Sequence, residues 1–501
     1  ANNALVGNGV SMVTLYYLRR FLKFLEESLA NQSAGEVTLS EEMVRFFEET
    51  LQVLRNHQNA LNGSISDKDR KTITDGLGET GSALREKIYR EGFSGEKKDI
   101  SLDEVREFAS LAREYMEHSI RANRREDKLY HAYNLLSYDT EGISISYLDE
   151  MLEGQVAALS SGSIGPAESV EVLDALRKSA LYREDQNSHI LYPNKELPNF
   201  LEKNNIPKNK VEKSELLQRM LNDGNTRIVE RDAAGAYHFN ANFRNADDLK
   251  SALRNLESAT YSSLAQTEES MLLNLFEEVF NHKAFTGRSG TFFGYEGLGS
   301  IYWHMVSKLH LAAYEVCRRA HEENASDEVK KALYRHFDEI GEGIGIHKDP
   351  EVYGAFPTDP YSHTPWHRGA QQPGMTGQVK EDILVRQGEL GLVFDQGRLK
   401  FEPFLLKKEE FLKNGESFHF NEVSGEKANR DIQPESLAFT VCQVPVIYEL
   451  GDKPGIRVEM THGEIVDLEE NELNDELSSS VFLRKGMVKG IHVKVKVAEL
   501  R

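Results

Sequence analysis

The 501-residue sequence has little cysteine and no long apolar run. Its two cysteines, Cys317 and Cys442, lie far apart, which excludes the disulfide framework of a small secreted domain. No apolar run approaches the length of a membrane span, and the N-terminus lacks the basic and apolar regions of a secretory signal. We therefore expect no membrane partner and a reducing, cytoplasmic setting. The chain begins with Ala1 rather than methionine, which suggests a processed, trimmed or incomplete chain.

Basic residues are also scarce. Lysine and arginine number 60 against 81 aspartate and glutamate residues, which gives a net charge of −21. Such a charge repels phosphate backbones, so nucleic acid is not an expected partner. The simplest interpretation is a solvated acidic surface, although a small anion can still bind in a locally basic pocket. Serine nucleophile elbows, phosphate-binding P-loops, dinucleotide fingerprints and CxxC pairs are absent.

Helical patterns dominate the first two thirds of the chain. Amphipathic spacing and N-cap signals predict about a dozen helices. We expect them near residues 13–29, 40 onward, 67–89, 101–122, 146–159, 166–179, 213–221, 245–256, 264–282, 296–321 and 327–340, with a short last one from about Gln378.

The pattern changes after about Gly388. Two strands are expected around an Asp395-Gln396-Gly397 turn, and further β-rich runs follow, ending in the alternating segment from Ile491 to Val497. The sequence therefore predicts a mainly α domain over residues 1–388 and a C-terminal β-sandwich over residues 389–501.

The segment 355–382 is the richest in polar and conformationally special residues. It has no helix or strand period, and such loops usually bind ligands. Its Gly374-Met375-Thr376-Gly377 run predicts a turn whose N–H groups and hydroxyl hold an anion, just before a helix N-terminus. Earlier in the same segment, Trp366, His367, Arg368 and Gln372 are candidates for contacts with a sugar.

A second dense segment, residues 287–316, combines glycines with aromatic rings. Arg288, flanked by glycines, can reach an anion or sugar hydroxyls. Tyr295, Glu296 and Trp303 are candidate sugar contacts, and His304 is a candidate anion ligand. The alternative is that the aromatic rings fill the core and that His304 is structural. Metal binding is not expected, because Pro365 separates His363 from His367 and disfavours helical ligand spacing.

Carboxylates that could act as a general acid lie further upstream. Cleavage of a glycosidic bond needs a carboxylic acid that protonates the leaving oxygen. The candidates are Asp185, its neighbour Glu184, and Asp139, and Tyr130 with His131 offer further sugar contacts. The alternative for each aspartate is a solvated loop carboxylate.

Three stretches resemble the inverting glycoside phosphorylases around glycoside hydrolase family 94 and the larger β-1,3-glucan phosphorylases. Residues 299–304, GSIYWH, are similar to the helix start whose histidine binds phosphate in that family. Residues 374–377, GMTG, resemble the turn that completes the phosphate site, and residues 389–405 resemble the crossover into a terminal sandwich. The family's Trp-Asn-Asp segment around the general acid is absent, as is its large N-terminal β-sandwich.

The resemblance implies an (α/α)6 barrel and a reaction with inorganic phosphate in place of water. Phosphate, held by His304, Thr376, Gly377 and Arg288, would attack the anomeric carbon of a β-linked gluco-oligosaccharide while an aspartate protonates the leaving sugar. No cofactor beyond phosphate is implied. The missing sandwich suggests an N-terminal half or a partner chain, and a homo-oligomer is a further option.

Two alternatives stay open. An inverting hydrolase of the same fold would need a carboxylate base about 6.5–9.5 Å from the acid, for which Glu296, Glu381 and Asp382 are candidates. A noncatalytic glycan-binding subunit would need neither group.

Overall fold

The computed structural model describes residues 9–30, 32, 35–193, 200–256, 259–280, 301–344, 363–364 and 375–501. The chain divides into two compact units, which we describe separately. The first holds residues 1–305 and 350–372, and the second holds residues 306–349 and 373–501. The predicted domain boundary at residues 388 and 389 stays a prediction.

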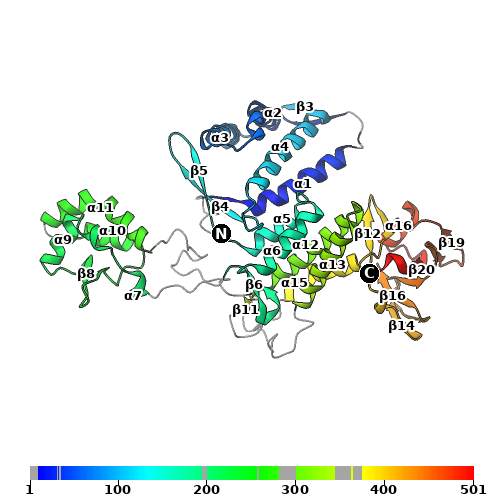
Figure 1. Cartoon of the computed structure of the whole chain (residues 1–501). Helices are drawn as coiled ribbons and strands as arrows, with labels where there is room; N and C mark the ends of the chain where they lie inside the picture. The colour runs from blue at the N-terminus through cyan, green and yellow to red at the C-terminus, as the bar shows by residue number, and fades with distance from the viewer. Residues whose placement is uncertain are drawn as a thin grey trace. The chain divides into compact units, whose positions relative to one another are not determined.

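Long helices form most of the N-terminal part of the first unit (Figure 1). They are α1 (Met12–Ala30), α2 (Glu41–Asn56), α3 (Asp67–Glu91), α4 (Leu102–Ala122), α5 (Leu152–Ser160) and α6 (Pro166–Lys178). Ser101 caps α4 by accepting a hydrogen bond from the N–H of Glu104, whose carboxylate accepts one in return from the N–H of Ser101. Helix α1 packs against α4 and α5. These elements agree with the expected mainly helical character.

Charged side chains link α1 to α4 beside an apolar core. Arg19 and Arg113 both donate to Glu117, and Arg113 also donates to Glu26. The Arg19 guanidinium reaches the carbonyl of Ser161 as well, at 3.1 Å. Each charge in this partly buried network therefore has a partner, which a buried ion pair needs in order to be tolerated.

Strands interrupt the helices of the first unit more than the sequence predicts. Strand β4 (Tyr133–Tyr138) pairs with β1 (Gly9–Ser11) and with β5 (Ile143–Tyr147), and β2 (Glu36–Ser40) pairs with β3 (Lys97–Ser101). The helix expected from residue 146 is therefore wrong at its start, because Ser146 and Tyr147 end β5 and α5 begins only at Leu152. The β-branched Ile143 and Ile145 and the aromatic Tyr147 favour the strand.

Residues 200–280, drawn in green in Figure 1, form a segment with its own core. Its elements are α7 (Phe200–Lys203), α8 (Lys208–Val211), α9 (Glu215–Asn222), β8 (Val229–Arg231), β9 (Tyr237–Phe239), α10 (Ala246–Arg254) and α11 (Ala259–Phe280). Every member of its buried cluster lies between Ile206 and Phe280. The rings of Phe239, Phe276 and Phe280 meet at its centre, with centroids 4.6–6.2 Å apart. This closed set of contacts is typical of an independently folding domain.

The second unit begins with helices and ends in strands. Helix α12 (Trp303–Glu322) enters it from the first unit, and α13 (Asp327–Glu342) and α15 (Met375–Glu389) follow. The predicted hairpin is confirmed as β12 (Leu392–Asp395) and β13 (Arg398–Phe401), joined at Gln396 and Gly397, both with positive φ. A type I′ turn requires positive φ at both of its central residues, and these two residues have it.

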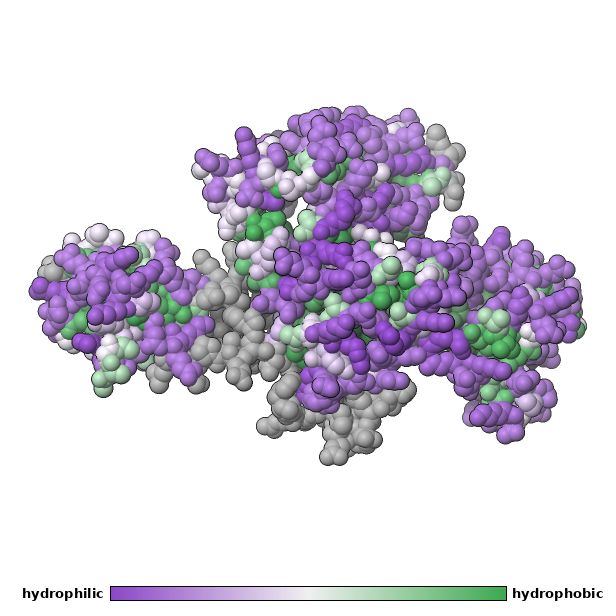
Figure 2. Space-filling view, in the orientation of Figure 1, coloured by the Kyte–Doolittle hydropathy of each residue, from purple (hydrophilic) through white to green (hydrophobic). Residues whose placement is uncertain are grey.

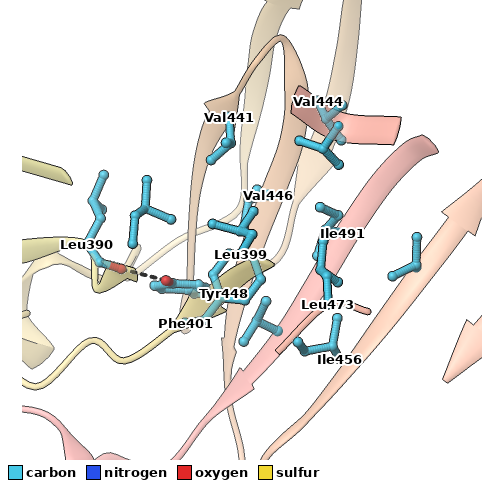
Figure 3. Packing of buried hydrophobic residues seen from close by; sticks show 14 of the residues in the cluster. Leu390, Leu399, Phe401, Val441, Val444, Val446, Tyr448, Ile456, Leu473 and Ile491 are labelled. Atoms are coloured by element: carbon cyan, nitrogen blue, oxygen red, sulfur yellow. Dashed lines mark hydrogen bonds between the residues drawn. The ribbon is translucent and has the colours of Figure 1, made fainter. Parts of the chain in front are cut away.

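A five-stranded sheet forms the main β-structure of the C-terminal part. Its order is β16 (Ser436–Val441), β17 (Val444–Leu450), β20 (Val488–Val495), β18 (Gly455–Met460), β19 (Ile465–Leu468), with only β17 and β20 parallel. The hairpin of β14 (Glu416–Asn421) and β15 (Lys427–Ile432) is separate, and α16 (Asp475–Phe482) contacts β13 and β20. Figure 3 shows the core between these elements, where the buried Tyr448 hydroxyl donates to the carbonyl of Leu390 at 2.5 Å.

The surface in view is mostly hydrophilic, which suits the high content of charged residues (Figure 2). Among the described helices, none combines the length and the apolar character that a membrane crossing requires.

Candidate functional site

Two of the motifs expected to carry chemistry meet through a short strand pair. Strand β10 (Ile301–Tyr302) pairs antiparallel with β11 (His363–Thr364), about sixty residues later in the chain. The register places Ile301 opposite Thr364 and Tyr302 opposite His363. The backbone therefore brings the start of α12 next to His363 and Thr364 of the polar segment, within the first unit.

For the first residues of α12 the sequence leaves two alternatives, a ligand contact or a structural role. Trp303 is fully buried, as expected for an aromatic ring that fills the core. Its role as a sugar contact stays a prediction. Nδ1 of His304 lies 3.0 Å from the hydroxyl of Tyr302, and the ring tautomer decides which of them donates. His304 as a phosphate ligand also stays a prediction.

Helix α15 begins at Met375, so the last three residues of the expected turn, Met375 to Gly377, are part of the helix. Thr376 and Gly377 lie in its first turn, about three residues before the predicted start at Gln378. The first four N–H groups of a helix have no partner within it, and they carry the positive end of the helix dipole. A helix N-terminus therefore stands at the predicted anion-binding position.

One turn further along α15 stands a buried carboxylate. Glu381 is 4 % exposed, and its Oε1 lies 3.7 Å from Nζ of Lys380. Its other oxygen, Oε2, is buried and has no hydrogen-bond partner within the described part of the chain. Partial burial and the charge of Glu381 both raise the pKa of the neighbouring Asp382. Glu381 thus offers a buried acceptor oxygen on α15.

Asp185, an expected general acid, lies in a one-turn 3-10 helix, Glu184–Gln186. Its two oxygens accept hydrogen bonds from Nε and Nη2 of Arg183 at 2.9 and 2.8 Å. The Arg183 side chain is almost fully buried, whereas that of Asp185 is 37 % exposed. A bidentate guanidinium favours the ionised carboxylate, but a general acid must carry a proton.

Asp139, the other acid candidate, stabilises the turn between β4 and β5. Its Oδ1 accepts from the backbone N–H groups of Glu141 and Gly142 at 2.8 and 2.7 Å. These two hydrogen bonds lower the pKa of the Asp139 carboxyl. The geometry is that of an Asx-turn, which gives the residue a structural reason to be present.

Tyr130 and His131 lie just before β4, and Tyr130 is a core residue. Tyr130 is 2 % exposed and donates its hydroxyl to Glu168 at 2.7 Å. The ring of His131 stacks on Tyr147 with centroids 4.0 Å apart. Burial, and then the positive charge of Arg125, lower the pKa of His131 to about 4. His131 is therefore neutral at pH 7, and contact of either residue with a sugar stays a prediction.

The remaining expected contacts fall outside the described residues. They are Arg288, Tyr295, Glu296, Trp366, His367, Arg368 and Gln372. Within the described ranges, no group of three histidine, cysteine, aspartate or glutamate side chains is arranged to hold a metal ion.

The sequence interpretation missed two features. The predicted helical domain takes in residues 200–280 without a break, although the Pro- and Asn-rich stretch 193–199 ahead of them signals a boundary. Glu381 is expected only as a possible base, without its burial. Glu381, Val385 and Gly388 recur at the spacing of one helix face, and this pattern places a carboxylate in an apolar stripe.

Comparison with protein families finds a match in the part of the chain that has its own core. Residues 197–283 match the GH149 phosphorylase insertion domain 2, and these bounds enclose the segment that has its own core. No curated protein matches the chain. The matched domain supports the broad class of glycoside phosphorylases. It gives no specific support for family 94 or for the β-1,3-glucan enzymes.

Proposed function

We propose that the chain is an inverting glycoside phosphorylase that cleaves a β-glucosidic bond of gluco-oligosaccharides with inorganic phosphate. The observation that carries the proposal is the match of residues 197–283 to an insertion domain of a phosphorylase family. The helical character of the first two thirds of the chain is compatible with the (α/α)6 barrel that the sequence resemblance implies. Inorganic phosphate is the only co-substrate in this proposal.

In the proposed reaction, a phosphate oxygen forms a bond to the anomeric carbon while the bond to the glycosidic oxygen breaks. The proton that the leaving oxygen needs comes from a carboxylic acid, for which we propose Asp185. Phosphate already carries the charge of a nucleophile, so one carboxyl group is enough. The N–H groups at the start of α15 can stabilise the negative charge of the phosphate. Phosphate contacts from His304, Thr376 and Arg288 are part of the proposal.

An inverting hydrolase is the second candidate, and the buried carboxylate of Glu381 favours it. A base that activates water needs an available acceptor oxygen, which Oε2 of Glu381 offers.

The decisive experiment incubates the protein with laminari-, cello- and sophoro-oligosaccharides, with and without phosphate. We expect phosphate-dependent release of glucose 1-phosphate. Reducing ends formed without phosphate would support the hydrolase, and binding without turnover would support a glycan-binding subunit. Asp185→Asn should lower the rate about 10²-fold or more, because it removes the proton donor; an unchanged rate would exclude Asp185 as the acid.

A further inference from the structure

Helix α1 is apolar on two opposite faces. On the inner face, Arg19 donates to Glu117 of α4, and Leu22 joins the apolar cluster that α4 helps to form. The opposite face carries four large apolar side chains that are 42–64 % exposed: Tyr17, Leu18, Phe21 and Phe24. A surface helix is normally polar on the side away from its core, and a helix that is apolar all round is typical of one covered on both sides. The outer face of α1 therefore has the character of an interface.

The exposed face also has the residue spacing of paired helices. Alternate steps of three and four residues separate Thr14, Tyr17, Phe21, Phe24 and Ser28, which we call the outer seam of α1. All five are exposed. Such steps keep the side chains in one row along the helix, and this is the pattern by which one helix packs along another.

The residues beside the outer seam distinguish the two orientations that a helix pair can take. Arg20 and Glu27, seven residues apart, flank the seam on one side, and Leu18 and Leu25 flank it on the other. In an antiparallel pair of two such helices each flank meets its own kind, so Arg20 of one copy faces Glu27 of the other. In a parallel pair the charged flank would face the leucines. Glu27 can reach a second copy, because its side chain is 63 % exposed even with Lys23 at 3.3 Å.

The area of the face fits a small symmetric interface. Since a large aromatic side chain presents about 200 Å², the four exposed apolar groups together present on the order of 400 Å². A standard interface buries about 800 Å² on each partner, so this face supplies about half of that area as an apolar centre, with the charged flank at its rim. Two chains that each carry a net charge of −21 repel, and the uncharged outer seam is a place where they can still meet.

We propose that the outer seam of α1 is an interface between two copies of this chain, which pair with their α1 helices antiparallel. A twofold axis between Phe21 and Phe24 brings Phe21 of each copy against Phe24 of the other, with Arg20 facing Glu27 on both sides of the axis. The dimer does not depend on the proposed reaction, and it would serve a phosphorylase, a hydrolase or a glycan-binding subunit alike.

Sedimentation of the full chain at increasing concentration measures the dimer. Phe21→Glu places a charge at the centre of the outer seam and should weaken dimerisation about thirtyfold or more, as the loss of a central aromatic anchor does. Tyr89→Glu on α3, at a position that is 82 % exposed in the same unit, is the matched control and should change nothing. Both substitutions lie on the surface, so both variants should keep the melting temperature of the wild-type monomer.

Two charge variants test the antiparallel orientation. Arg20→Glu and Glu27→Arg should each weaken the dimer about fivefold, because each makes both flank contacts repulsive. When the two variants are mixed in equal amounts, every glutamate of one copy faces an arginine of the other. The mixture should therefore form a heterodimer about as well as the wild type forms its homodimer, which energy transfer between labelled copies can measure.

Three results would overturn the proposal. The first is a monomer at every concentration, which would mean that the outer seam pairs with no second copy. The second is a dimer that Phe21→Glu leaves intact or that Tyr89→Glu weakens equally. The third is a mixture of the two charge variants that shows no recovery.

Discussion

The 200–280 segment and the α12–α15 region carry different kinds of information. The first has an apolar core closed within itself and matches a phosphorylase insertion domain. The second lies outside the matched residues, and it holds His304, the N-terminus of α15 and the buried Glu381. The family likeness and the candidate chemistry therefore lie in different parts of the chain.

This difference shows what each observation can support. An inserted domain with its own core can keep its fold whatever the surrounding chain does. Its similarity to a phosphorylase insertion domain therefore supports only a broad class of enzyme. The reaction itself must be argued from polar groups held in place elsewhere, such as the carboxylate in the apolar stripe of α15.

The largest effect is expected from Phe276→Ala in α11. Phe276 is fully buried, and its ring meets those of Phe239 and Phe280 at centroid distances of 5.0 and 4.6 Å. Its loss should destabilise the 200–280 segment by about 3–5 kcal/mol. Hydrogen exchange should show lost protection in α9–α11 and unchanged protection in the C-terminal sheet. Met271→Ala, at an exposed position of the same helix, is the matched control. Lost protection in both regions would show that the segment is not independent.

A smaller loss is expected from Gly388→Ala, because the added methyl group would meet the Tyr314 ring. Overpacking of this kind costs about 1–3 kcal/mol and should also disturb the position of Glu381. Gly78→Ala in α3 is the control, since nothing lies within 4 Å of the added Cβ. There the better helix former should stabilise by about 0.5–1 kcal/mol. Equal melting temperatures for the two variants would contradict the close contact of α12 with α15.

His131 should make the first unit sensitive to mild acid. Its pKa falls from 6.5 to about 4 on folding, because burial and Arg125 disfavour the charged ring while Asp127 opposes them. The unfolded chain then binds the proton first, so this stability is present above pH 6.5 and is lost as the pH falls toward 4. We expect about 1–2 kcal/mol over this window, given that the ring is only partly buried. His131→Gln should flatten the dependence in urea unfolding, and the exposed His419→Gln should not; an equal slope in wild type and His131→Gln would refute the assignment.

The smallest effect is expected from Asp139→Asn. An asparagine oxygen can still accept from the N–H groups of Glu141 and Gly142, so the turn should persist. The melting temperature at pH 7 should stay within about 2 °C of wild type. Because backbone hydrogen bonds lower the pKa of Asp139, its charge-dependent stability is lost only as the pH falls below about 4. A rate about 10²-fold lower in this variant would instead identify Asp139 as the general acid.

Elements with a strong local signal could be predicted from the sequence. The helix from Asp67 has an N-cap at Ser66, and the β12–β13 hairpin has Gln396 and Gly397 at positions that need positive φ. The β4–β5 hairpin could not be recognised, because its strands are short and their pairing depends on contacts with β1. For the site, the sequence predicts the start of α15, whereas the burial of Glu381 depends on how that helix packs in the folded chain.

The central claim is that phosphate, and not water, accepts the glycosyl group. The most direct test is ³¹P NMR of the protein with a mixture of β-linked gluco-oligosaccharides and inorganic phosphate. The account predicts a growing glucose 1-phosphate signal and no new reducing ends when phosphate is omitted. Reducing ends formed at the same rate without phosphate, and no sugar phosphate in its presence, would contradict it.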